Sequence, residues 1–276
     1  ASDVYKRQNL NPMSVIFTAR GAFILVTLSL LFSGFLTSAL ILLFDPAGQA
    51  FLPSTLIVGE LLLVVPLIVI LTRNTVNLGE TLRINPVSKR TLLLSVLLSC
   101  GIVAWADELD RIISLIIPPP QWLDQLGQFL RVEDPLSLTL IFIGAVPLAA
   151  FSEEILFRGF LQQVLEKQWK DVTRAVLVGS LFFAVVHLIP YWAVQIYLLG
   201  VIMGYLAWIT NSIFPSMILH GINNGIAFSF ANWGDFFEGW YTWNGHVSPL
   251  ILAIGTAMTI IGFKQLNRTL TPAIES

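Results

Sequence analysis

Three short motifs hold the side chains of this chain that could carry out a reaction. They are Glu153-Glu154-Ile155-Leu156-Phe157-Arg158, Phe183-Ala184-Val185-Val186-His187 and His220-Gly221-Ile222-Asn223-Asn224. A carboxylate and an imidazole can together activate a water molecule, while a second imidazole and an Asn amide can stabilise an oxyanion. These residue types indicate hydrolysis of a peptide bond by an activated water.

Helical spacing sorts these side chains further. Glu154 and Arg158 are four residues apart, so they share a helix face and can form an ion pair. Glu153 is rotated by one residue and is left free to face another group. His220 and Asn224 are also four residues apart and can point into one cavity. The spacing therefore predicts one paired and one free carboxylate.

Other hydrolytic chemistries fit the sequence less well. No serine nucleophile is apparent, because a G-x-S-x-G motif is absent and Ser152 faces another direction from Glu153 on the helix. A zinc site remains an alternative, since Glu153, His187 and His220 could supply three ligands and leave a fourth position open. The zincin signature H-E-x-x-H is absent, so this alternative depends on residue types alone. We predict no certain cofactor and keep Zn as a possibility.

The composition places these motifs in a membrane protein. Of the 276 residues, 55% are hydrophobic and only 12% are charged, about half the charged share of a typical soluble domain. The formal net charge is −2, and the Lys and Arg residues are scattered, which argues against a nucleic-acid partner. The single cysteine, Cys100, cannot form an internal disulfide and is interpreted as a core residue.

The apolar runs predict an all-α, polytopic membrane protein with about eight transmembrane helices. A spanning helix needs about 20 mostly apolar residues. The candidate spans are residues 15–44, 51–72, 91–106, 136–166, 174–194, 195–212, 213–231 and 247–263. Residues 107–134, which include Pro118, Pro119 and Pro120, are expected to form an interfacial amphipathic segment that breaks at the prolines, or a solvated loop.

Ionisable residues inside these spans are expensive and are therefore functional candidates. Glu153 and His187 each lie roughly 20 Å along their helices from the cytoplasmic end, and His220 with Asn224 roughly 10–16 Å. A carboxylate, two imidazoles and an amide can thus reach a similar depth. The four-residue spacing also lets the ring of Phe183 flank His187.

Two further polar residues receive structural interpretations. Glu60 is alone in the second span without an obvious partner, and we interpret it as structural or cavity-lining. His246 belongs to an external loop with Trp240, Tyr241 and Trp243, where an aromatic interface belt is expected.

The distribution of basic residues predicts the orientation. Lys and Arg concentrate on the cytoplasmic side of short loops, and eight spans with the N-terminus inside place nearly all of them there; only Arg111 and Arg131 fall outside. We predict an integral protein of the plasma (inner) membrane with both termini cytoplasmic. Its organisation is a polar N-terminal segment at 1–14, one membrane domain at 15–264 with its peptidase core at 136–231, and a C-terminal tail at 265–276.

The three motifs together resemble those of the CAAX protease and bacteriocin-processing family of intramembrane peptidases, also called the CPBP or Abi family. The family pattern is E-E-x-x-x-R, then F-x-x-x-H, then H-x-x-x-N, and all three occur here in order, each in a predicted span. The resemblance implies an all-helical protease whose site opens toward the cytosol. Its substrate would be a peptide or protein that is membrane-associated or lipidated at its C-terminus, and the lipid bilayer would be its environment.

The resemblance also implies a role for each motif residue. Glu153 would activate water with His187, and His220 and Asn224 would stabilise the oxyanion. Glu154, Arg158 and Phe183 would act as support. Family members are often labelled metalloproteases, while a glutamate-type mechanism needs no metal. We favour the metal-free mechanism, because Asn is a natural oxyanion donor but an uncommon zinc ligand.

Two other classes of function are compatible with buried polar residues. In an ion- or proton-coupled transporter, Glu153, Glu154 and the histidines would form a relay, although no convincing inverted repeat is present. In a non-catalytic immunity or scaffold protein, the same fold would only bind a partner. Substitution of Glu153 separates both from an enzyme.

Overall fold

The computed structural model describes residues 17–44, 52–74, 77–123, 131–132 and 134–274 of the chain. Within these residues the regular secondary structure is helical except for one small hairpin, in which β1 (Thr242–Trp243) pairs antiparallel with β2 (His246–Val247). The all-α prediction is therefore confirmed. The polar segment predicted at residues 1–14 lies outside the described residues.

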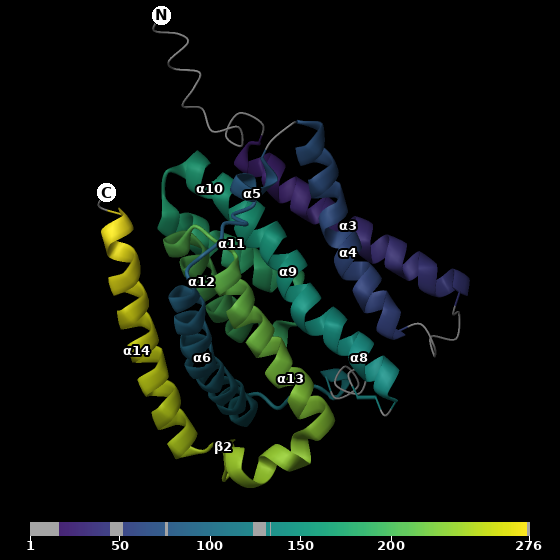
Figure 1. The fold of residues 1–276 in the computed structure, drawn as a ribbon. Coiled ribbons are helices and arrows are strands. Elements are labelled where there is room, and N and C mark those ends of the chain that lie inside the picture. Colours follow the sequence, from purple (N-terminus) through teal and green to yellow (C-terminus); the bar gives the residue numbers. More distant parts are fainter. Residues whose placement is uncertain (1–16, 45–51, 75–76, 124–130, 133, 275–276) are drawn as a thin grey trace, which may run out of the picture.

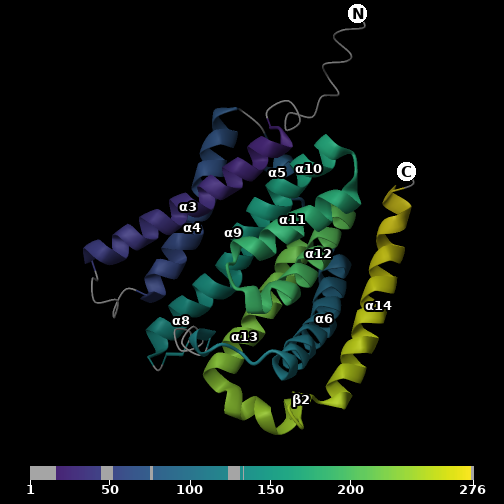
Figure 2. The same cartoon turned by 180° about the vertical axis from the view of Figure 1, so that it is seen from behind.

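The helices form a bundle in which sequence-distant elements lie side by side (Figures 1 and 2). Helices α3 and α4 pack together on one side, α6 and α14 on the opposite side, and the remaining long helices between them. The helices before the central ones are α3 (Ala19–Phe44), α4 (Leu52–Arg73), α5 (Leu78–Thr81) and α6 (Lys89–Ile116). The later ones are α8 (Pro135–Ile143), α9 (Ala149–Glu154), α10 (Gln162–Trp169), α11 (Val172–Val186), α12 (Ala193–Thr210), α13 (Phe214–Tyr241) and α14 (Pro249–Ile274).

Six helical segments among the described residues are long and apolar enough to cross a membrane, so the predicted count of eight is not confirmed. These segments are Ala19–Phe44, Pro53–Arg73, Lys89–Ile116, Pro135–Trp169, Pro190–Thr210 and Pro249–Leu270. Helix α11 has only 15 residues. Helix α13 contains His220, Asn223 and Asn224, which lower its hydropathy. The two missing spans are thus helices that carry candidate site residues.

Two boundaries differ from the sequence prediction. Helix α6 does not end near residue 106 but continues to Ile116, so the first third of the expected interfacial segment is helical. It ends there because Ile117 takes an extended conformation directly before Pro118, and a residue before proline disfavours the helical region. Helix α14 likewise continues to Ile274, through most of the residues assigned to a C-terminal tail.

The helix that carries the two glutamates is interrupted by two π-helical segments. Segment η1 (Gly144–Leu148) precedes α9 and η2 (Ile155–Leu161) follows it, so Glu153 and Glu154 end a short α-helix between two wide turns. Pro147 lies within η1 and cannot donate a backbone hydrogen bond, which favours a departure from α-helical geometry. Single π turns inside helices occur frequently at functional sites.

A buried ion pair anchors the end of this helix to its neighbours. Arg83 lies in the loop after α5 and donates to both carboxylate oxygens of Glu166 on α10 and to Oδ1 of Asn211 at the end of α12. The backbone of the α5 loop also packs closely on η2, because a Cβ on Gly159 would lie 2.6 Å from the carbonyl oxygen of Leu82. These contacts hold the α5 loop against the site-bearing helices.

Candidate active site

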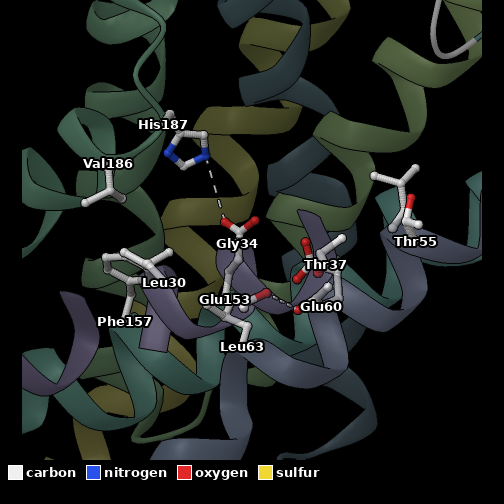
Figure 3. A pocket seen from close by; sticks show the side chains of 13 residues that line it. Leu30, Gly34, Thr37, Thr55, Glu60, Leu63, Glu153, Phe157, Val186 and His187 are labelled. Carbon is white, nitrogen blue, oxygen red and sulfur yellow. Dashed lines mark hydrogen bonds and ion pairs between the residues drawn. The ribbon is translucent and has the colours of Figure 1, made fainter. Parts of the chain in front are cut away.

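Glu153 faces both motif histidines from the end of α9. Its Oε2 atom lies 3.9 Å from Nε2 of His187 and 3.9 Å from Nε2 of His220. Figure 3 shows the carboxylate of Glu153 directed toward the ring of His187. This Oε2 atom is buried and has no hydrogen-bond partner among the described residues. The sequence prediction that Glu153 is free to face another group is confirmed.

Each imidazole is oriented by a contact at its other nitrogen. Nδ1 of His187 lies 2.6 Å from the carbonyl oxygen of Phe183, one turn earlier in α11. Nδ1 of His220 lies 3.0 Å from Oε1 of Glu154. Because both partners are acceptors, we assign a proton to each Nδ1, and each Nε2 is left to face Glu153.

Glu154 and Arg158 form the predicted ion pair in the interior of the bundle. Nη1 of Arg158 donates to Oε1 of Glu154 over 2.7 Å, and the side chains are 3% and 0% exposed. Arg158 also donates to the carbonyl oxygen of Gly200 over 3.3 Å. The sequence did not indicate that Oε1 of Glu154 also binds His220, so this carboxylate links Arg158 to one of the imidazoles.

Phe183 connects the cation to the histidines. The guanidinium carbon of Arg158 lies 4.2 Å from the centroid of the Phe183 ring. The same ring makes edge contacts with His187 at 4.6 Å and with His220 at 5.9 Å between ring centroids. The prediction that Phe183 flanks His187 is confirmed, and one ring contacts the buried cation and both imidazoles.

Asn224 makes its hydrogen bonds with groups outside this cluster. Its Nδ2 atom donates to the carbonyl oxygen of Ala145 over 3.0 Å, and its Oδ1 accepts from Nδ2 of Asn223 over 3.4 Å. These bonds tie α13 to the π-helical segment η1. The structure therefore brings Glu153, His187 and His220 together, whereas the role of Asn224 as an oxyanion donor stays a prediction.

A cavity of about 350 Å³ lies directly beside Glu153 and His187. Its walls come from α3, α4, η2 and the end of α11, and Figure 3 shows the lining side chains. Glu60 of α4 lines this cavity as well, as the sequence allowed, and it accepts a hydrogen bond from Ser152. The position of Glu60 inside a predicted span indicates a possible functional role. Its contact with Ser152 depends on how α4 packs on α9, which the sequence does not reveal.

The arrangement of the possible ligands bears on the zinc alternative. Among the described residues, no group of three or more His, Cys, Asp or Glu side chains is arranged to hold a metal ion. Tetrahedral zinc ligands at about 2.0–2.1 Å from the metal would lie roughly 3.3 Å from one another, compared with 3.9 Å between Glu153 and each histidine. We therefore derive no reaction step through a metal.

Comparison with known protein families found one match, over about a third of the chain. Residues 135–226 match the model of the Type II CAAX prenyl endopeptidase Rce1-like family. The resemblance to the CAAX proteases is confirmed. The matched segment runs from α8 into α13 and includes every residue of the three motifs. It supports an intramembrane CAAX-type endopeptidase in general terms, an enzyme whose substrate is a peptide or protein. No curated protein and no solved structure matches the chain.

Proposed function

We propose that the chain is an intramembrane endopeptidase that hydrolyses a membrane-associated or C-terminally lipidated substrate with a water activated by Glu153. One observation carries this proposal: the buried, unpaired Oε2 of Glu153 lies 3.9 Å from two imidazole nitrogens beside a cavity. A buried acceptor without a partner is uncommon in native proteins, because it loses the hydrogen bonds that water would supply. A water molecule that donates to this oxygen removes that penalty.

In the proposed mechanism, the water donates one hydrogen bond to Oε2 of Glu153 and the other to Nε2 of His187. As the water oxygen attacks the substrate carbonyl carbon, its proton passes to Glu153 and the carbonyl oxygen becomes an oxyanion. When the C–N bond breaks, Glu153 returns the proton to the leaving amine. The same carboxylate thus serves first as general base and then as general acid.

His220 is the proposed oxyanion donor. With both ring nitrogens protonated, it donates from Nδ1 to Glu154 and presents its second N–H to the space beside Glu153. Removing one oxyanion donor typically lowers kcat by about 10²–10³-fold. Asn224 would assist with the amide proton that it does not donate to Ala145. Glu154, Arg158 and Phe183 hold His220 and His187 in place.

We further propose eight membrane crossings with both termini cytoplasmic, in a plasma (inner) membrane. Helix α5, the end of α10 and the end of α14 lie at the same end of the molecule (Figure 1). Arg83, Lys170 and Arg268 belong to that end, as the positive-inside rule requires of a cytoplasmic face. Helices α11 and α13 would complete the count, with their polar residues shielded inside the bundle.

The deciding experiment incubates the purified protein in detergent micelles with a peptide library, with and without a chelator, and identifies products by mass spectrometry. We expect cleavage that persists in chelator and is lost in Glu153→Gln. The matched control is Glu80→Gln, which changes an exposed carboxylate in α5. Full activity in Glu153→Gln overturns the proposal. Loss of cleavage in chelator would instead make the enzyme metal-dependent.

The same variant separates the competing functions. Proton-coupled flux in liposomes without proteolysis of any peptide would favour a transporter. Biological protection that persists in Glu153→Gln would favour a non-catalytic immunity or scaffold protein.

A further inference from the structure

The cavity beside Glu153 has an unusual charge distribution for a site inside a membrane protein. Its lining includes the carboxylates of Glu60 and Glu153 and the imidazole of His187, but no Lys or Arg side chain. Arg158, a buried cation of segment η2, is bound to Glu154 and lies over the ring of Phe183. The described part of the cavity wall therefore offers two carboxyl groups and no permanent positive charge.

Glu60 is not needed for the proposed hydrolysis, yet it enters the same space. Figure 3 shows its side chain beside that of Glu153, projecting from the neighbouring helix α4. One of its oxygens, Oε2, accepts from the hydroxyl of Ser152. The other oxygen, Oε1, makes no hydrogen bond with the part of the chain that the structure describes. A carboxylate in a membrane span is expensive, and one oxygen of this carboxylate is available to a ligand.

A second acceptor lies next to Glu60. The hydroxyl oxygen of Thr37, on α3, is buried and has no hydrogen-bond partner among the described residues. It lies 3.3 Å from the position that a Cβ on Gly59 would take. Gly59 thus keeps open the space where α3 and α4 meet. Two polar atoms, Oγ1 of Thr37 and Oε1 of Glu60, border that space, and neither has a hydrogen-bond donor among the described residues.

The rest of the wall suits an aliphatic chain. Leu30, Leu63, Phe157 and Val186 line the same cavity, whose volume of about 350 Å³ falls within the roughly 300–1,000 Å³ of small-ligand pockets. Long basic side chains bury their methylene groups along apolar surfaces while their charged ends reach polar partners. An ammonium supplies three hydrogen-bond donors and no acceptor, so it can donate both to the carboxylate of Glu60 and to the hydroxyl oxygen of Thr37.

Taken with the proposed function, on which this inference rests, we propose that the cavity selects substrates with a Lys or Arg side chain next to the scissile bond, and that Glu60 binds this cation. The opposite charge is disfavoured: an acidic side chain, or a free C-terminal carboxylate in that position, would meet two carboxylates. In a site of low dielectric such repulsion is stronger than in water. The substrate class is therefore basic peptides in a membrane setting, cleaved internally.

The test uses the full-length protein and one cleaved library peptide, resynthesised with Lys, acetyl-Lys, Leu or Glu at each of the two positions that flank the scissile bond. The readout is the ratio of kcat/KM values between peptides, which does not depend on the overall activity of a variant. We expect Lys to exceed acetyl-Lys and Glu at one position by at least roughly tenfold, equivalent to about 1.4 kcal/mol. Acetylation removes the charge while it keeps the length of the chain.

Glu60→Gln should bring the ratio of Lys to acetyl-Lys close to one, because it removes the charge but keeps an oxygen that can accept from Ser152. Glu80→Gln, at an exposed site in α5, should leave the ratio unchanged. A wild-type enzyme without a preference for Lys overturns the inference, as does a preference that persists in Glu60→Gln.

Two outcomes keep this inference distinguishable from the proposed function. Cleavage of library peptides without any charge preference contradicts the cation site alone. No cleavage of any peptide contradicts the peptidase, and the cation site falls with it. If Glu60→Gln does not fold in detergent, the comparison of Lys with acetyl-Lys in the wild type still decides the matter.

Discussion

Two clusters in this molecule use nearly the same set of side chains. In the bundle interior, Glu154 pairs with Arg158 four residues later and also binds Nδ1 of His220. The guanidinium of Arg158 lies over the ring of Phe183. Near the C-terminal end of α6, Asp107 pairs with Arg111 four residues later, and the guanidinium of Arg111 lies over the ring of Tyr241. In the same cluster, Glu108 binds Nδ1 of His246. The residue types alone would rank the two clusters as equal candidates.

The difference lies in what remains unsatisfied. Both oxygens of Glu108 are occupied, because Oε1 faces His246 at 2.8 Å and Oε2 accepts from the backbone N–H of Val247 at 2.8 Å. The interior cluster instead adds Glu153, whose buried Oε2 has no partner in the described structure. The outer cluster does leave the buried hydroxyl of Tyr241 without a partner among the described residues, but the carboxylate that binds its histidine is saturated. A saturated carboxylate is suited to holding the β1–β2 hairpin on α6, whereas an unsaturated carboxylate beside a cavity is suited to binding a reactant.

Removing the cation from each cluster should give the largest difference between the two clusters, measured as loss of unfolding free energy. Arg158→Met leaves Glu154 charged and buried, and breaking such a pair typically costs about 3–5 kcal/mol. Arg111→Met affects a pair whose side chains are both 23% exposed, so we expect a loss below about 1 kcal/mol. Reversible unfolding in mixed micelles, followed by circular dichroism, measures both. Equal losses would mean that burial does not distinguish the clusters.

Removing the imidazole from each cluster tests function rather than stability. His220→Ala should lower kcat by about 10²–10³-fold, as expected for the loss of an oxyanion donor. His246→Ala should leave kcat within roughly twofold, because surface substitutions far from a site seldom change its geometry. Peptide cleavage at saturating substrate provides the measurement. A comparable loss of kcat in both variants would contradict the assignment of the reaction to the interior cluster.

The sequence revealed more about the site residues than about their surroundings. Helical spacing was enough to predict the Glu154–Arg158 pair and the contact of Phe183 with His187, because both lie within one turn of a single helix. The bond from Glu154 to His220 joins residues 66 positions apart, and the bond from Ser152 to Glu60 joins residues 92 apart. Such contacts depend on how helices pack, and no local pattern encodes that.

The same limit explains the errors in the fold. Apolar runs located every long helix approximately, but a run does not show where a helix ends, so α6 was ended at its first acidic residues. In the structure those residues, Asp107 and Glu108, continue the helix, where Arg111 and His246 bind their side chains. Apart from Pro147, the sequence carries no signal for the two π-helical segments around Glu153, because the apolar residues that form them would also suit an α-helix.

The most local of the expected effects concerns the hairpin that Glu108 holds. Glu108→Gln replaces a carboxylate that accepts two hydrogen bonds with an amide that keeps one good acceptor. Losing one bond to a charged group should destabilise the hairpin by about 1–2 kcal/mol. Hydrogen–deuterium exchange of residues 242–247 should therefore accelerate roughly 5–30-fold, while peptide cleavage stays near the wild-type rate. Glu238→Gln, an exposed change on the same helix end as Tyr241, is the matched control and should leave exchange unchanged. If Glu108→Gln abolished cleavage without faster exchange, the outer cluster would belong to the reaction, and saturation would no longer separate a structural cluster from a reactive one.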